Sequence, residues 1–225
     1  MTDKITQKNN FIYLFIALVS LLFSMSLLKQ IELSWIEEIV EVIVLGVLIL
    51  GVHSLKSERP WMHSVYVMVA VMISSFIVKK IFGDSHVLEY MHLVILLVFF
   101  TGSFYLSIVQ VAMSEEVNQN MIVGSIVLYL LLALIWTIIY LLILSIFSDS
   151  FNGLEQLPWQ ENFSNVAYFS FVTLTTLGYG DISPNNSISE FFVYTQAVAG
   201  IFYMAIIVSS LVAGRIKTFN RDKNE

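Results

Sequence analysis

Long apolar runs without charge dominate this chain. Residues 117–148 contain no Lys, Arg, Asp or Glu, and about 20 consecutive apolar residues in a helix suffice to cross a ~30 Å hydrocarbon core. Of the 225 residues, 57% are hydrophobic and 12% are charged, roughly half the charge density of an average soluble domain. The charged residues lie mainly between the runs. This pattern excludes a soluble enzyme and predicts an all-α membrane protein in a lipid bilayer.

Composition and motif spacing exclude several function classes. A net charge of −6 provides no basic surface for a nucleic-acid partner. The absence of cysteine excludes disulfides, thiol catalysis and cysteine-ligated metal sites. An intramembrane serine protease would need a Gly-x-Ser motif and a later histidine, whereas Gly102-Ser103 and Gly124-Ser125 lack the spacing and no histidine follows His92. We therefore predict no enzyme activity and no cofactor.

Six apolar runs are candidate transmembrane helices: Phe11–Leu28, Trp35–Leu55, Trp61–Val78, Val87–Met113, Met121–Phe147 and Phe191–Gly214. The second is the weakest, because three glutamates crowd its first turns. Six crossings place both termini on one side, and basic residues near both termini and after the second run predict that this side is cytoplasmic. Lys79 and Lys80 oppose this orientation. The sequence thus predicts a multi-pass protein of the cell membrane with both termini cytoplasmic.

A discontinuous segment separates the fifth and sixth runs. Residues 149–163 contain Asn, Gly, Pro and Trp and are typical of an extracellular loop. Asn162 or Ser164 could cap a short helix from Asn165 to about Thr175, which is too short to cross the bilayer. The natural interpretation is a re-entrant helix. A secondary transporter would instead show broken helices in two matching halves, and only this segment is discontinuous.

The residues after this short helix read Thr-Thr-Leu-Gly-Tyr-Gly-Asp, from Thr175 to Asp181. They resemble the selectivity filter of tetrameric potassium channels, whose pattern is Thr-x-Gly-Tyr-Gly-Asp. Such a filter needs backbone carbonyls that replace the hydration shell of an ion, and its glycines tolerate backbone angles that a Cβ would resist. The position of the match between two apolar runs, directly after a short helix, suits a filter.

The resemblance implies a complete architecture and function. The fold would be six transmembrane helices plus a re-entrant pore helix and a filter loop, in a homotetramer around a central pore. K+ would bind at the carbonyls of Thr176, Leu177, Gly178 and Tyr179, with Gly180 and Asp181 completing the filter. Residues 1–115 would form a four-helix membrane domain and residues 116–225 the pore domain. The expected function is a potassium-selective ion channel; the alternatives are a non-conducting auxiliary or sensor subunit and a less selective cation channel.

The match has departures behind the filter. Family pore helices commonly carry a tryptophan pair where this chain has Tyr168 and Phe169. Phe169 cannot donate the ring hydrogen bond that a tryptophan there gives to the filter tyrosine. Val172 stands where some bacterial members have a glutamate paired with the aspartate after the filter. These changes predict weaker support behind the filter. Gating at the filter is therefore an alternative to gating at the inner helix.

By the same resemblance, the sixth run is the inner helix that lines the pore. Gly200 lies 24 residues after Thr176, where family members have a glycine that acts as a gating hinge, although a glycine in a membrane helix is usually there for close packing. One face of this helix would line the inner cavity and form an apolar cytoplasmic gate. The residues on that face are Ile201, Met204, Val208, Val212 and Ile216.

The first four runs suggest the voltage-gated topology without its sensor chemistry. Between Met91 and Ser114 there is no charged residue, whereas a voltage sensor needs a series of arginines. We therefore expect voltage dependence to be absent or weak. A carboxylate cluster could instead sense external pH or a divalent cation; the alternative is a solvated helix end. Its members are Glu37, Glu38 and Glu41. None of the four histidines is predicted to be a ligand.

Overall fold

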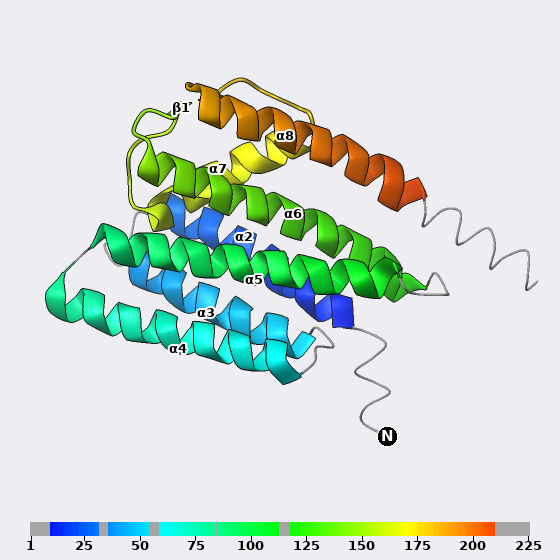
Figure 1. Cartoon of the computed structure of the whole chain (residues 1–225), viewed down its shortest axis with the longest axis horizontal. Helices are drawn as coiled ribbons and strands as arrows, with labels where there is room; N and C mark the ends of the chain where they lie inside the picture. Colours follow the sequence, from blue (N-terminus) through cyan, green and yellow to red (C-terminus); the bar gives the residue numbers. More distant parts are fainter. Residues whose placement is uncertain (1–9, 32–35, 55–58, 84, 113–117, 210–225) are drawn as a thin grey trace, which may run out of the picture.

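The computed structural model of the chain describes residues 10–31, 36–54, 59–83, 85–112 and 118–209 (Figure 1). These ranges are helical apart from a two-stranded ribbon and short connections. The helices are α2 Asn10–Ile31, α3 Ile36–Ser54, α4 Arg59–Phe82, α5 His86–Ala112, α6 Gln119–Ile146, α7 Trp159–Leu174, α8 Ser187–Tyr203 and the π-helical turn η1 Met204–Val208. Successive long helices run in opposite directions, so the described chain begins and ends at the same end of the bundle (Figure 1).

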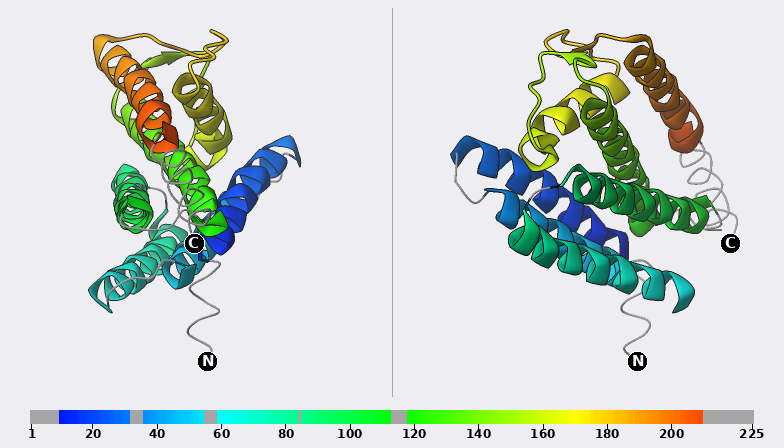
Figure 2. Two further views of the ribbon diagram at one scale, coloured as in Figure 1. Left: turned by 90° about the vertical axis from the view of Figure 1, so that its right-hand side faces the viewer. Right: turned by 60° about the vertical axis from the view of Figure 1, so that its left-hand side comes forward.

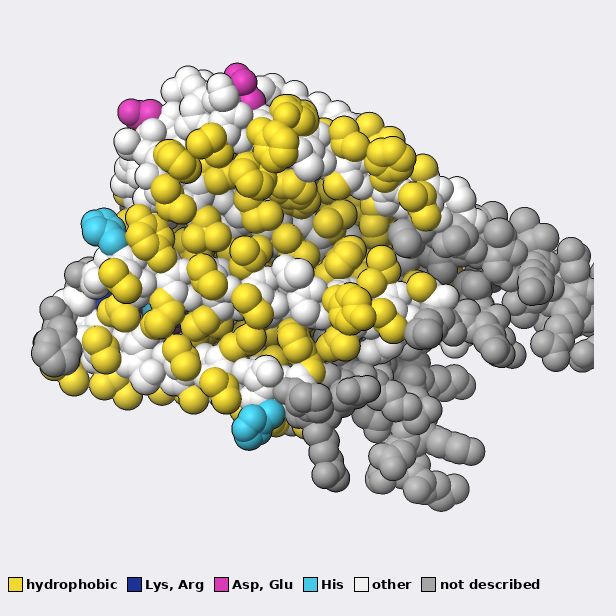
Figure 3. Space-filling model, viewed as in Figure 1, with side chains coloured by type: hydrophobic (Ala, Val, Ile, Leu, Met, Phe, Trp, Pro, Cys, Tyr) yellow, Lys and Arg dark blue, Asp and Glu magenta, His cyan; other side chains and the backbone are white. Residues whose placement is uncertain are grey.

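Five described helices are long and apolar enough to cross a membrane: α2, α4 over Trp61–Ile81, α5, α6, and α8 with its extension to Ile206. Helix α3 is not among them, because its first six residues include Glu37, Glu38 and Glu41. Hydrophobic side chains cover most of the face in Figure 3. The structure is thus an all-α protein with several membrane-length helices, and the crossing by α3 stays a prediction.

Helix α6 is the most buried of the five and organises the packing. It lies along α5 on one side and against α2 and α7 on the other. At the start of α2, the backbone N–H of Phe11 donates to the Asn120 side chain at 3.3 Å, so the first helix is held against the first turn of α6. Helices α2, α3 and α5 therefore pack directly on the later helices of the same chain, and α4 packs on α3 and α5. The predicted boundary at residue 115 lies outside the described residues.

Helix α7 begins earlier than predicted. It starts at Trp159 after Pro158, which has φ −50° and provides no side-chain cap. Proline is tolerated at a helix start because the N–H that it lacks would have no helical partner there. The prediction that Asn162 or Ser164 caps this helix is wrong, because the helix already begins at Trp159 and includes both residues. Asn162 lies inside it and donates to the carbonyls of Glu155 at 2.8 Å and Leu157 at 3.3 Å, which fixes the preceding loop.

The loops on either side of α7 meet in an antiparallel ribbon. Strand β1, Phe151–Asn152, pairs with β2, Ser183–Pro184, with Phe151 opposite Pro184. Gly153 has φ +81°, and a Cβ there would lie 2.3 Å from the carbonyl oxygen of Asp181. The segment that precedes α7 therefore supports the segment that follows it. Figures 1 and 2 show α7 at the end of the bundle where α6 ends and α8 begins.

Candidate functional site

The segment after α7 has an unusual backbone. Thr176, Gly178 and Gly180 have positive φ angles of 60°, 56° and 84°, and neither Leu177 nor Tyr179 between them does. Glycine adopts this region freely, whereas a β-branched residue such as threonine is a genuine outlier there. Strained backbone of this kind persists only where its surroundings enforce it, typically at functional sites. The predicted filter segment therefore has an alternating backbone that an ordinary loop does not need.

The last turns of α7 hold this segment in place. The backbone N–H of Leu177 donates to the Val172 carbonyl at 2.9 Å, and that of Gly178 lies 3.4 Å from the same oxygen. The N–H of Thr176 donates to the Thr173 carbonyl at 2.9 Å. These bonds tie three successive amides of the predicted filter to α7, so a movement of α7 near Val172 would move the backbone of this segment.

Tyr168 supplies a support for the filter that the sequence analysis missed. Its hydroxyl donates to Asp181 Oδ2 at 2.8 Å, and its ring stacks on that of Tyr179 with centroids 6.4 Å apart and planes 9° apart. The hydrogen bond to Asp181, followed by desolvation and by the charge of the same carboxylate, raises the pKa of Tyr168. The hydroxyl thus stays protonated as a donor. Family members commonly have a tryptophan at this position, and tyrosine is also a hydrogen-bond donor. The sequence therefore contained a sign of this bond in Tyr168.

Phe169, which has no hydrogen-bond donor in its ring, packs among other aromatic rings. It is buried in an aromatic cluster, with its ring centroid 5.3 Å from that of Tyr140 and 5.6 Å from that of Phe151. Val172 is also buried. Apolar packing occupies these two positions behind the filter, and Tyr168 makes the hydrogen bond to the aspartate.

Side chains of the filter itself are exposed in the single chain. Leu177 and Tyr179 are 56% and 67% exposed, although both would be expected to bury apolar surface. Thr176, Gly178, Gly180 and Asp181 are also exposed. One chain therefore presents an open filter strand and does not by itself enclose an ion site.

The inner-helix prediction is only partly described. Ile201 and Met204 are 58% and 53% exposed. The side chain of Val208, and all of Val212 and Ile216, lie outside the described residues. The one-face pattern assumed a continuous α-helix, yet η1 brings π-type hydrogen bonding between Met204 and Val208, and a π turn shifts the register of every later residue. The five-residue lining therefore stays a prediction.

Gly200 has a packing role that its spacing did not indicate. A Cβ on it would lie 2.2 Å from the carbonyl oxygen of Leu174, at the end of α7, and 3.1 Å from Leu174 Cδ1. The absence of a side chain lets the backbones of α8 and α7 approach closely beside the filter. This contact favours the close-packing interpretation of Gly200; the hinge remains a prediction.

Two of the three glutamates of the predicted sensing cluster have described side chains, and these two occupy different environments. Glu41 is buried, and its Oε1 accepts a hydrogen bond from Gln160 Nε2 at 3.1 Å. Glu38 is exposed, and the side chain of Glu37 lies outside the described part. Within the described ranges, no group of three or more His, Cys, Asp or Glu residues could hold a metal ion. Glu41 therefore contacts the first turn of α7, and the described residues do not support a divalent-cation site.

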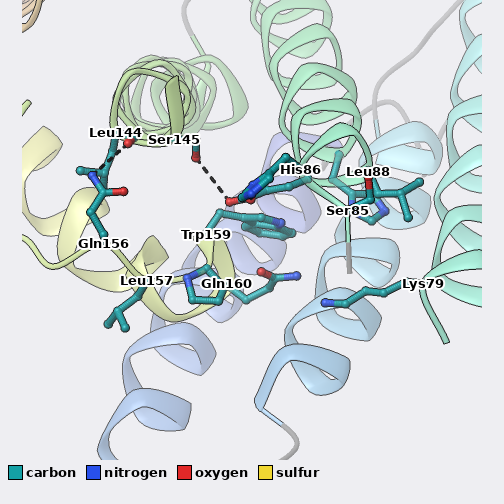
Figure 4. Close-up of a pocket in the computed structure, with 13 residues that line it drawn as sticks. Lys79, Ser85, His86, Leu88, Leu144, Ser145, Gln156, Leu157, Trp159 and Gln160 are labelled. Atoms are coloured by element: carbon teal, nitrogen blue, oxygen red, sulfur yellow. Dashed lines mark hydrogen bonds and ion pairs between the residues drawn. The ribbon is translucent and has the colours of Figure 1, made fainter. Parts of the chain in front are cut away.

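A cavity of about 350 Å³ lies beside this contact (Figure 4). Its walls come from the end of α4 with Lys79, the start of α5 with His86 and Glu89, the end of α6 with Ser145, and the start of α7 with Trp159. Ser145 Oγ donates to Glu89 Oε1 at 3.3 Å, and His86 Nδ1 lies 3.8 Å from Glu89 Oε2. The cavity thus joins the ends of helices from both halves of the chain.

Comparisons with known proteins find a similarity to ion channels in the second half of the chain. Residues 124–213 match the family model described as "Ion channel", and these residues include most of α6, all of α7, the filter segment and α8. Over 88 residues the chain is 32% identical to the protein named "Two-pore potassium channel 4" from Arabidopsis thaliana. That match covers 37% of this chain and 30% of the plant protein. No solved structure gives a significant match. The chain therefore contains a segment similar to ion channels, including a potassium channel, among membrane-length helices.

Proposed function

We propose that this protein is a potassium-selective channel. The observation that carries the proposal is the alternation of positive φ at Thr176, Gly178 and Gly180 in a Thr-x-Gly-Tyr-Gly-Asp segment tied to the end of α7. Alternating backbone handedness turns successive carbonyls toward one side, unlike a strand, in which they alternate. K+ binds at the carbonyls of Thr176, Leu177, Gly178 and Tyr179, which replace its hydration shell.

The channel is a homotetramer in this proposal. The exposed Leu177 and Tyr179 need neighbouring chains to cover them, and four filter strands are needed to surround an ion. Helix α8 exposes further large apolar side chains, among them Phe191, Val198 and Ile201, which are 50%, 48% and 58% exposed. These side chains divide between subunit contacts and the wall of the inner cavity, where an apolar ring closes the pore by dewetting.

The first four helices act without a voltage sensor. Helix α5 carries no charged residue after Glu89, so the membrane potential has no charge to move in it. The buried Glu41 contacts Gln160 at the start of the pore helix, which gives this region a route to the filter. External protons are the stimulus proposed for that route, and the exposed Glu38 and the neighbouring Glu37 are the less direct candidates.

The test is a recording from the full-length protein purified in detergent and reconstituted in planar bilayers. With K+ on one side and Na+ on the other, the reversal potential should follow the K+ gradient. A reversal potential near zero would instead show a less selective cation channel. No conductance in vesicles proven to contain tetramers would show a non-conducting subunit, and either result overturns the proposal.

A further inference from the structure

The most completely satisfied buried polar group in the pore region lies at mid-length of α8. Gln196 is 0% exposed, and a buried amide in a membrane helix is costly unless its partners are fixed. Its Nε2 donates to the Ser170 carbonyl at 3.0 Å and contacts Ser170 Oγ at 2.8 Å. Its Oε1 accepts a hydrogen bond from the hydroxyl of Tyr140. Both ends of the amide are therefore engaged.

These bonds join three helices. Tyr140 belongs to α6, Ser170 to α7 and Gln196 to α8, and the hydroxyl of Ser170 donates onward to the Ala133 carbonyl of α6 at 2.7 Å. Every member is 0% exposed. In a low-dielectric interior, a fully satisfied network of this kind is rigid, and breaking one partner leaves the others unpaired. The three helices are therefore held in one relative position at this level.

The network lies next to the anchor of the filter. Ser170 is two residues before Val172, whose carbonyl accepts from the Leu177 amide. On α8, Gly200 follows Gln196 by one helical turn and lies on the same face, where it packs against Leu174. A displacement of α8 is thus transmitted to α7 at two successive points, one by hydrogen bonds and one by close backbone packing.

We infer that Gln196 is a positioning residue that couples the inner helix to the selectivity filter. Resting on the proposed channel function, this assigns a regulatory link to the same site: movement of α8 acts through the Gln196–Ser170 bonds on the Val172 carbonyl and on the Leu177 amide bound to it. Tyr140 holds the other end of the Gln196 amide against the outer helix, so the link has a fixed support.

The test compares Gln196→Met with two controls. Methionine keeps the volume and the unbranched shape but removes all three hydrogen bonds of the amide. Thr195→Val is the matched control, because Thr195 is on the same helix and, among the described residues, its hydroxyl bonds only to the Phe191 carbonyl of its own helix. Leu128→Ala, at a fully buried position of α6 outside the network, controls for loss of stability alone. Tyr140→Phe removes one hydroxyl and keeps the test open if Gln196→Met does not assemble.

Two measurements decide the outcome. In bilayers, Gln196→Met should shorten filter open times by about tenfold and make them more dependent on external K+, with an unchanged reversal potential; Tyr140→Phe should act in the same direction and less strongly. Hydrogen exchange is measured on tetramers in K+. Protection of the Leu177 amide should fall about tenfold in Gln196→Met, which is about the effect of one broken hydrogen bond. Thr195→Val should leave this protection unchanged.

Hydrogen exchange separates the two proposals, because it does not require conduction. If the wild-type protein does not conduct but Gln196→Met shows the expected loss of protection at Leu177, the channel function is overturned and the coupling between α8 and the Leu177 amide is supported. If Gln196→Met and Tyr140→Phe lower thermal stability as Leu128→Ala does, while exchange at Leu177 and the K+ dependence of gating match wild type, Gln196 has only a structural role and the inference is overturned.

Discussion

The contact between α6, α7 and α8 differs from the second half of α5 in how its buried hydroxyls are bonded. Around α7, the amide and hydroxyls of Tyr140, Ser170 and Gln196 are buried and mutually bonded. In α5, the hydroxyls of Ser103 and Ser107 are buried with no hydrogen-bond partner among the described residues. Buried polar groups are expensive in a membrane. The bonded group formed by Tyr140, Ser170 and Gln196 lies next to the predicted filter, and this comparison indicates where the protein needs a fixed geometry.

Replacing Gly178 by alanine should give the largest effect in the pore region. Its φ of +56° costs a residue with a Cβ on the order of 1–2 kcal/mol, repeated in every subunit around the ion. The K+/Na+ permeability ratio, measured from reversal potentials, should fall by at least tenfold or conduction should cease. Gly46→Ala is the matched control in α3, since a Cβ there meets nothing within 4 Å. Normal selectivity in Gly178→Ala would contradict the filter assignment.

Gly200→Ala tests whether the contact between α8 and α7 is as close as the structure has it. The added Cβ would meet the Leu174 carbonyl, and overpacking of this kind costs about 1–3 kcal/mol. The melting temperature of the tetramer should fall by several degrees and filter openings should shorten. A pure hinge would behave differently, with a lower open probability, unaltered stability and unaltered filter kinetics; thermal melts and single-channel records distinguish the two.

Tyr168→Phe should produce a smaller change confined to the filter. It removes the hydroxyl that donates to Asp181 and keeps the ring stacked on Tyr179. We expect filter inactivation several-fold faster, with selectivity kept. Because the pKa of Tyr168 is raised, its neutral donor form is stabilised, and this support is lost only as pH rises through that raised pKa. Wild type should therefore show no loss of this support between pH 7 and 9. Tyr105→Phe, at an exposed position of α5, is the control.

The smallest expected effect is that of membrane voltage on open probability, which would act through helices α2 to α5. Each elementary charge that crosses the field contributes about 2.3 kcal/mol per 100 mV, and α5 has no charge after Glu89 to move. Open probability should change little between −100 and +100 mV. Gating currents equivalent to several charges per subunit, recorded with the pore blocked, would show that the N-terminal helices carry a sensor after all.

Most of the long helices and the filter-like motif follow from local patterns in the sequence. Uncharged apolar runs are local features, so α2, α5 and α6 were predicted within a few residues of their observed bounds, and the filter pattern in Thr176–Asp181 is contiguous. The start of α7 was missed because Pro158 begins a helix there without a side-chain cap, while Asn162 and Ser164 resemble caps. The π turn at Met204–Val208 has no signal in the apolar pattern.

Only the tertiary structure decided which distant residues act together. The Tyr168–Asp181 bond, the contact of Glu41 with Gln160 and the linkage of Tyr140, Ser170 and Gln196 each join separate elements. Along the chain, Gln196 is one polar residue in an apolar helix, and its partner cannot be read from spacing. Its role depends on which face of α8 meets α7. Side-chain hydrogen bonds form only over about 3 Å. The close approach of the two backbones at Gly200 brings this face of α8 near enough to α7 for such bonds.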